Sequence, residues 1–263
     1  MNLRLALTKS QKGRIEEVVK NGDRRAQFYE ETLKEYVQNW KVGSLAHGIY
    51  STFFDRYYSG LQHTAQTEIF YVKTASPLVI GNGGQSVLEA HLTLHHTYGV
   101  PYLPGTAIKG VAAHYCHRYL SEDENFKKKG LYHKVLFGSQ EAAAKIIYYD
   151  ALPLKEKLSE TLRLDVLTPH HQKYYQAGHA GARREIDPPR DDDSPIPVHF
   201  LSVKGQFQMA LGWGGEQDDP EAQNWLRVAQ QIVLYALEQE GIGGKTNTGY
   251  GRIVRVSGEE GTG

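Results

Sequence analysis

Cysteine is almost absent from this chain of 263 residues, and several features that would mark a special class of protein are missing too. The single cysteine, Cys116, excludes a disulfide bond within the chain and fits a reducing cytoplasm. The sequence contains no run of about 18 apolar residues, so we expect no membrane-spanning helix. The first residues soon become too polar for a signal peptide. These absences predict a cytoplasmic protein.

An excess of charge of either sign is lacking as well, because 30 basic residues balance 30 acidic ones. That balance is unfavourable for binding nucleic acid through bulk electrostatics alone, but it allows one basic face or RNA contacts from backbone amides. Hydrophobic residues make up 40% of the chain, which is enough for a folded core. The 17 tyrosines suit core packing or stacking on bases, and we favour packing for most of them.

Patterns of helix and strand are present along most of the chain. Residues 11–62 have helical periodicity, with a break expected at Asn21-Gly22-Asp23. Two later helices are predicted over 106–120, with Thr106 as the N-cap, and over 131–137. The last helix has Asp219 as its N-cap and Pro220 as its first residue, and Gly241 ends it. The predicted strands are 66–72, 86–95, 145–150, 162–167, 199–211 with a bulge or turn at Gly205, and 252–256.

The order of these elements defines the expected fold class. Without insertions it is strand, helix, strand, strand, helix, strand, which predicts an α+β fold of the ferredoxin-like (RRM-like) type. Residues 1–65 are an N-terminal helical elaboration, 66–256 the main domain and 257–263 a flexible tail. Residues 170–198 lack periodicity and contain four prolines, so they predict a long insertion.

The segment from Gly241 to Gly251 is the most informative one, because five of its eleven residues are glycine. Glycines let several amides point into one concavity that holds an anion, while Lys245 adds charge, and Thr246 and Thr248 add hydroxyls. A Walker A loop is excluded, because its first glycine would fall at Gln239 and the segment follows a helix. A flexible connection without function remains an alternative.

Two further segments suit contacts with RNA. In residues 104–110 a helix N-terminus carries Lys109, which an anion would help to accommodate. Taken alone, this segment favours the alternative, an ordinary capped helix with an exposed lysine. Residues 164–175 contain histidines and tyrosines that could stack on bases. The alternative for that segment is structural, with Asp165 and His170 joining the strand end to the loop through hydrogen bonds.

The 12 histidines raise the question of metal binding and acid–base catalysis. His114 and His117 are spaced three residues apart in a predicted helix and could supply two ligands. No complementary cluster has zinc-ligand spacing, and no Ser/His/Asp set can be recognised, so we predict neither a metal nor another cofactor.

Taken together, these segments resemble the CRISPR RAMP superfamily. Residues 104–110 look like its P-G-S/T-x-I/L-K-G segment, and residues 241–251 look like its glycine-rich loop. Residues 98–102, 165–170 and 195–201 narrow the resemblance to the sixth subunit of type III-B (Cmr) effector complexes.

The resemblance implies a RAMP fold and a non-catalytic structural subunit of an antiviral complex that binds CRISPR RNA near its 3′ end. Its partners would be target RNA, the backbone and end-capping RAMP subunits and the small helical subunit. Residues 170–198 would match a thumb-like hairpin that presses on the guide–target duplex. The implied RNA-binding residues are Lys109, Gly110, Arg118, Gly243, Gly244, Lys245, Thr246, Tyr174, Tyr175, Arg183, Arg184 and His91. The alternative is a metal-independent CRISPR RNA-processing endoribonuclease of the same superfamily, in which a histidine acts beside a tyrosine or lysine.

Overall fold

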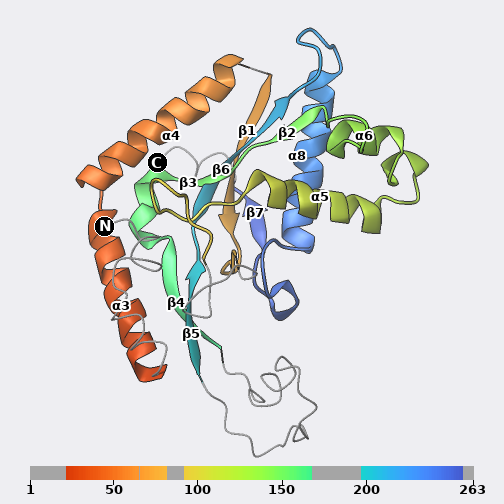
Figure 1. Ribbon diagram of the computed structural model, residues 1–263. Helices are drawn as coiled ribbons and strands as arrows, with labels where there is room; N and C mark the ends of the chain where they lie inside the picture. Colours follow the sequence, from red (N-terminus) through yellow and green to blue (C-terminus); the bar gives the residue numbers. More distant parts are fainter. Residues whose placement is uncertain (1–21, 65, 82–91, 168–196, 257–263) are drawn as a thin grey trace, which may run out of the picture.

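The computed structural model describes residues 22–64, 66–81, 92–167 and 197–256 (Figure 1). Its helices are α3 (Gly22–Asn39), α4 (Leu45–Thr64), α5 (Gly105–Tyr119), α6 (Leu131–Phe137) and α8 (Ala222–Gln239), with short 3₁₀ helices η1 (Glu124–Phe126), η2 (Lys155–Glu160) and η3 (Thr246–Thr248). Its strands are β1 (Thr67–Thr74), β2 (Ile146–Tyr148), β3 (Leu152–Pro153), β4 (Leu162–Leu167), β5 (Val198–Val203), β6 (Gln206–Trp213) and β7 (Ile253–Arg255). No helix among these described residues is long and apolar enough to cross a membrane.

The main sheet is antiparallel and has the strand order β2-β6-β1-β7. The short strand β3 also pairs with β6, beside β2, so that two pieces of chain share one edge of the sheet. Strand β1 is central in this sheet, between β6 and β7, which suits a strand with apolar residues on both faces. In β1, Phe70, Val72 and Thr74 are buried and alternate with half-buried residues, as the two-residue period of a strand requires.

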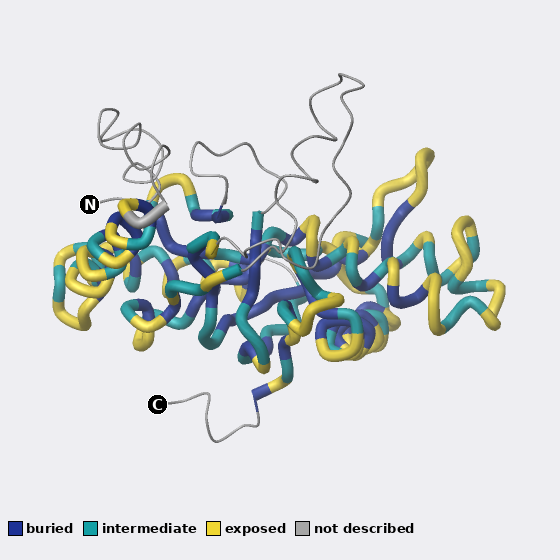
Figure 2. Tube along the Cα trace, turned by 90° about the horizontal axis from the view of Figure 1, so that it is seen from below, coloured by how far each residue is buried: buried dark blue, intermediate teal, exposed yellow. Residues whose placement is uncertain are grey.

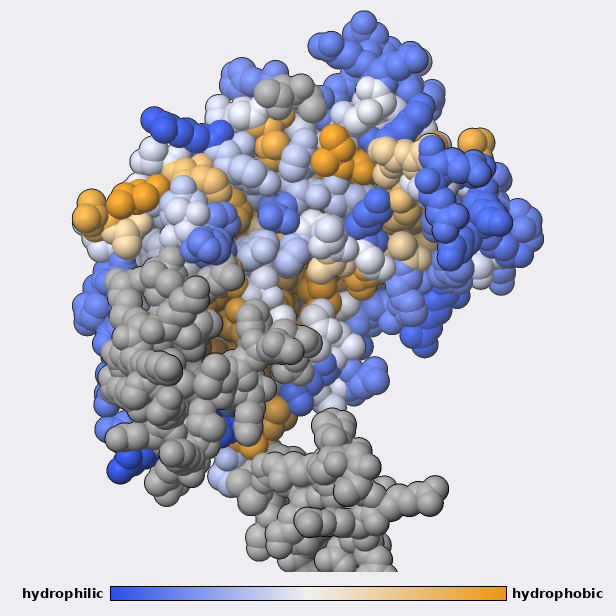
Figure 3. Space-filling view, in the orientation of Figure 1, coloured by the Kyte–Doolittle hydropathy of each residue, from blue (hydrophilic) through white to orange (hydrophobic). Residues whose placement is uncertain are grey.

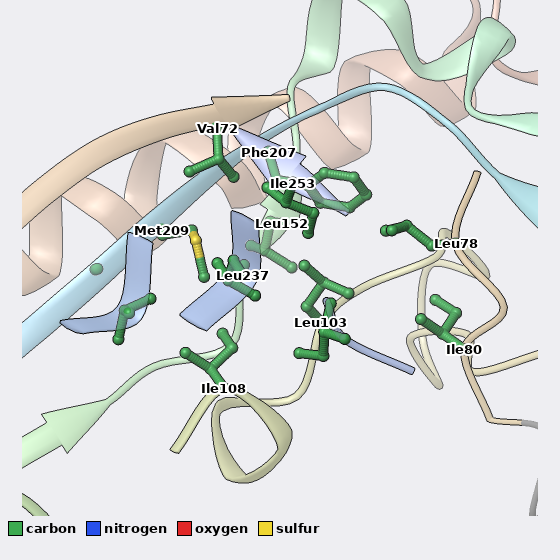
Figure 4. Close-up of a cluster of buried hydrophobic side chains, with 14 of the residues drawn as sticks. Val72, Leu78, Ile80, Leu103, Ile108, Leu152, Phe207, Met209, Leu237 and Ile253 are labelled. Atoms are coloured by element: carbon green, nitrogen blue, oxygen red, sulfur yellow. The ribbon is translucent and has the colours of Figure 1, made fainter. Parts of the chain in front are cut away.

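Helices α5 and α8 pack against each other and on the main sheet. Figure 4 shows the core between them, where Val72, Phe207 and Met209 of the sheet meet Ile108 of α5 and Leu237 of α8. Each fully buried side chain of this kind contributes about 1.5–3 kcal/mol relative to an exposed one. In Figure 2 buried residues fill the middle of the molecule, and most exposed ones lie toward its two ends.

A second sheet consists of β4 and β5 alone, paired from Leu162↔Val203 to Leu167↔Val198. The predicted single strand over 199–211 is therefore wrong, because its two halves belong to different sheets. The expected turn at Gly205 separates them: Gly205 has a φ of 154°, and its amide donates to the Thr74 hydroxyl over 3.0 Å. A bridge between Leu78 and Val203 joins the second sheet to the segment that follows β1.

Helices α3 and α4 lie on the opposite side of the molecule from α6 (Figure 1). Their aromatic side chains enter the same core and reach the rest of the chain through hydroxyl groups. The Tyr36 hydroxyl lies 2.7 Å from the Thr161 hydroxyl, and the Tyr50 hydroxyl donates to the Pro153 carbonyl over 2.7 Å. Burial is the main cause that raises the pKa of both tyrosines, so both hydroxyls stay protonated as donors at neutral pH.

Several predicted boundaries differ from the observed ones. Gly22 begins α3, and the break between the described helices α3 and α4 lies at residues 40–44. The N-cap of α5 is Pro104 rather than Thr106, and that of α8 is Glu221 rather than Asp219. In the latter case, the Asp219 carboxylate accepts the Glu221 amide over 3.0 Å, so it caps the turn that precedes the helix.

The strand predicted over 86–95 lies only partly in the described chain, since residues 82–91 fall outside it. Residues 92–95 form an isolated bridge from Leu94 to Pro101 rather than a strand. The predicted insertion, 170–198, falls almost entirely outside the described residues, between β4 and β5, and the tail over 257–263 lies outside them too. By contrast, the predicted ranges of α6 and β4 are confirmed residue for residue.

Candidate nucleic-acid interface

The glycine-rich loop, residues 241–251, connects α8 to β7 in a conformation that needs its glycines. Gly241, Gly243, Gly249 and Gly251 all have φ values between 75° and 95°. Lys245 also has a positive φ, 62°, and forms the N-cap of η3. A left-handed backbone at a lysine is uncommon and indicates a position that the surrounding structure determines.

Hydrogen bonds hold this loop against the segment that follows β1. The Gly244 amide donates to the Val79 carbonyl over 2.7 Å, and the Gly251 amide donates to the Pro77 carbonyl over 2.9 Å. A Cβ atom on Gly243 would lie 2.5 Å from the Val79 carbonyl oxygen, so only glycine fits there. These contacts argue against a merely flexible connection. Sequence reasoning missed the anchor, although the apolar run after Pro77 is a signal for a short strand.

The outer side of the loop presents polar groups to solvent. Gly243, Asn247 and Thr248 are exposed, while Lys245 and Thr246 are half-buried. Among the described residues, no acceptor receives a hydrogen bond from the amides of Gly243 and Lys245. These two amides and the Lys245 ammonium group are therefore available to an anion.

The two threonines serve the loop itself more than the sequence predicted. The Thr248 hydroxyl donates to the Lys245 carbonyl over 2.9 Å, so it is occupied within the loop. The Thr246 methyl group is so close to the backbone that a Cβ on Gly251 would come within 3.1 Å of it. Both side chains thus help to fix the turn at Lys245.

Tyr250 ties the loop to the second sheet. Its hydroxyl donates to Asp165 Oδ2 over 2.9 Å, while Asp165 Oδ1 accepts the Val166 amide over 2.9 Å. Burial and this hydrogen bond raise the pKa of Tyr250, so the phenol stays protonated as a donor. Asp165 does have the structural role that the sequence left open, with Tyr250 as a partner; His170 lies outside the described residues.

The start of α5 lies against the edge of the main sheet rather than in open solvent. The Gly105 amide donates to Asp150 Oδ1 over 2.7 Å, and a Cβ on Gly105 would collide with the Tyr148 carbonyl oxygen at 2.0 Å. Asp150 therefore supplies the negative charge that favours a helix N-terminus. Lys109 is half-buried on α5, and its charge acts on His133 of α6.

The other end of α5 meets the end of α8, just before the glycine-rich loop. Arg118 Nη1 donates to both carboxylate oxygens of Glu240, over 3.1 and 3.2 Å. Glu240 directly precedes Gly241, so the structure brings Arg118 to the base of the loop. Gly110, on the exposed side of α5, has no atom within 4 Å of the place where a Cβ would stand.

The remaining predicted site residues fall outside the described chain: His91, Tyr174, Tyr175, Arg183 and Arg184. Across the described ranges, no group of three or more His, Cys, Asp or Glu side chains is arranged to hold a metal ion. The described part of the predicted interface therefore consists of the glycine-rich loop and the exposed side of α5.

An antiparallel sheet covered by two helices, with a glycine-rich loop between the second helix and the last strand, defines the class of protein. The chain belongs to the RAMP superfamily, whose family model matches residues 71–254.

More particularly, the chain is similar to CRISPR system Cmr subunit Cmr6 of Pyrococcus furiosus, with 28% identity over 81% of this chain and 75% of the relative. Its fold is similar to a chain in the cryo-EM structure of the type III-B Cmr-beta complex bound to cognate target RNA. That match has a TM-score of 0.60 and 19% identity, over 89% of this chain and 73% of the other. The crystal structure of Cmr6 from Pyrococcus furiosus matches with a TM-score of 0.47 and 28% identity, over 74% of this chain and 99% of the other.

Proposed function

We propose that this chain is a non-catalytic structural subunit of a type III-B CRISPR RNA-guided antiviral effector complex. In that role it binds CRISPR RNA near its 3′ end and contacts neighbouring RAMP subunits. Membership of the RAMP superfamily and the similarity to Cmr6 support this proposal. The order β1, α5, β2 with β3, β6, α8, β7, together with the strand order of the main sheet, supports a ferredoxin-like core.

The glycine-rich loop carries the RNA-binding part of the proposal. It is fixed on one side by Val79 and Pro77, and on the other it exposes amides and the Lys245 ammonium group. A rigid loop of this kind binds a phosphate without losing conformational entropy. Such a site also makes RNA binding compatible with a net charge of zero, because binding depends on a few well-placed hydrogen-bond donors rather than on total charge. We assign the phosphate contacts to the amides of Gly243 and Lys245, the Lys245 ammonium group and the Thr246 hydroxyl. The predicted contact of Gly244 is not through its amide, which donates to the Val79 carbonyl.

The start of α4 and the turn before it support a contact with a neighbouring subunit. Val42 is 73% exposed, Leu45 82% and Ile49 53%, and they lie within one stretch of chain. Figure 3 shows orange hydrophobic surface at that edge of the molecule. Exposed apolar surface of this kind is typical of protein interfaces. We propose that this apolar surface contacts the backbone, end-capping or small helical subunit.

For residues 170–198, the family resemblance supports the proposal of a thumb-like hairpin at the guide–target duplex.

Co-purification of tagged chain from its native host tests the assembly. We expect other RAMP subunits by mass spectrometry, together with short RNAs of uniform repeat-derived 5′ ends. Lys245→Ala should lower the amount of RNA recovered, whereas Lys34→Ala, which replaces an exposed lysine of α3, should not. Recovery of the chain alone, without such RNA, would contradict the proposal.

The ribonuclease alternative has a separate test. Pure protein is incubated with repeat RNA in the presence of a chelator, and the products are separated by size. Intact RNA agrees with a structural subunit. Cleavage at one position, lost on replacement of a histidine, would establish the enzyme.

A further inference from the structure

An open pocket of about 490 Å³ lies between α5 and α6, and its polar lining is cationic. Its side chains are Ala113, His114, His117 and Arg118 from α5, Lys128 from the loop after η1, and His133 from α6. In Figure 3 the surface over the end of α5 and the following loop is strongly hydrophilic. His114 and His117, the histidine pair whose spacing could supply two metal ligands, are surrounded here by Arg118, Lys128 and His133.

The electrostatics around His133 indicate that the charge of the pocket is positive. Burial lowers the pKa of His133 most, and the charges of His117, Lys128 and Lys109 lower it further. The three side chains whose charge lowers the pKa of His133 are all basic. In addition, His133 Nδ1 is buried, and no described residue forms a hydrogen bond with it. Bringing an anion close would relieve this repulsion and favour the protonated imidazole.

The acidic groups nearby are already engaged elsewhere. Glu240 of α8 accepts two hydrogen bonds from Arg118 and lies 3.9 Å from His114 Nε2. Glu124 of η1 forms an ion pair with Lys127. These two carboxylates are paired, whereas Lys109 and Lys128 form no ion pair with any described residue.

We propose that this α5–α6 pocket binds a phosphate group of RNA, as a second anchor beside the glycine-rich loop. The inference rests on the proposed RNA-binding function. The arrangement of the two sites supports it, because Arg118 lines the pocket and also bonds Glu240, the residue before the loop. An RNA strand bound at the glycine-rich loop would therefore meet the cationic α5–α6 pocket beside it. Cations from one helix face and one loop suit either an internal phosphodiester or a terminal phosphate.

The test compares two double variants of the full chain that remove the same kinds of side chain. The pocket variant is Lys128→Gln with His117→Gln. The matched control, Lys41→Gln with His63→Gln, alters residues of the α3–α4 turn and α4. The affinity for a labelled single-stranded RNA is measured by fluorescence anisotropy. Two RNAs are used, one with a 3′-hydroxyl and one with a 3′-phosphate.

We expect the pocket variant to lose about three- to tenfold in affinity relative to the control variant, as for one solvent-exposed ion pair or one ordinary hydrogen bond. A loss confined to the 3′-phosphate RNA assigns a terminal phosphate, and an equal loss assigns an internal one. If the two variants bind RNA with equal affinity, the pocket is not a phosphate site. The proposed function would still stand in that case, provided that the wild-type chain binds RNA. Absence of wild-type binding would overturn the proposed RNA-binding function itself.

Discussion

The hydroxyl of Tyr250 donates a 2.9 Å hydrogen bond to Asp165, and this contact joins the glycine-rich loop to a strand of the second sheet. The two residues are 85 positions apart in the chain. The loop is consequently held from two directions, by the backbone of Pro77 and Val79 and by a side chain of β4. Its shape depends on the tertiary structure and not on its glycines alone.

Replacing Tyr250 by phenylalanine should lower the free energy of unfolding by about 0.5–1.5 kcal/mol. It removes one hydrogen bond and leaves Asp165 Oδ2 without that donor, while the ring remains near Phe200. Urea denaturation followed by circular dichroism measures the change. Tyr235→Phe is the control, since Tyr235 is 52% exposed and stacks on Tyr115 through its ring. Equal stability of the two variants would contradict a role of the Tyr250 hydroxyl.

Gly243→Ala should distort the loop and weaken RNA recovery. The φ of 95° costs an alanine about 1–3 kcal/mol, and its Cβ would lie 2.5 Å from the Val79 carbonyl oxygen. Gly60→Ala in α4 is the matched control, because nothing outside the helix's own backbone lies within 4 Å of its Cβ position. That control should raise stability slightly, by about 0.5–1 kcal/mol. Thermal unfolding and RNA recovery are measured for both, and wild-type values for Gly243→Ala would refute the tight fit.

Gly110→Ala separates stability from RNA contact. Gly110 lies inside α5 with open space around its Cβ position, so alanine should stabilise the helix by about 0.5–1 kcal/mol. If RNA passes close to this glycine, as the family resemblance implies, the added methyl group lowers RNA affinity at the same time. Higher melting temperature with unchanged affinity would remove Gly110 from the RNA-binding residues.

Cys116 should resist alkylation as long as the chain is folded. Its side chain is buried, and burial raises the pKa of the thiol to about 12, so almost no thiolate exists near neutral pH. We expect iodoacetamide to label it in denaturant but not in buffer, as read by intact mass. Rapid labelling in buffer would mean that α5 leaves the core readily.

Local patterns were enough to predict the helices and strands whose signals lie within one segment. The ranges of α6 and β4 follow from short apolar stretches bounded by glycine or polar residues, and Gly138 ends α6 as expected. The central position of β1 followed from apolar residues on both faces. These features depend on near neighbours in sequence, which a single sequence displays.

Features that depend on distant partners could not be predicted in the same way. Asp150 caps α5 from 45 residues away, in place of the local Thr106. The separation of β5 from β6 depends on their different partners, since only pairing shows which sheet a strand joins. The α5–α6 pocket likewise requires that Lys128 and His133 fold back onto α5, which spacing along one helix does not reveal.

The central position of β1 has a consequence for how the chain is made. Its partners are residues 206–213 and 253–255, so the strand emerges from the ribosome long before either of them. Contacts of such wide sequence separation slow folding and leave apolar edges exposed in the meantime. A nascent chain that stops before residue 253 would keep one edge of β1 open, and such edges template aggregation. Only a chain translated as far as β7 can complete its main sheet.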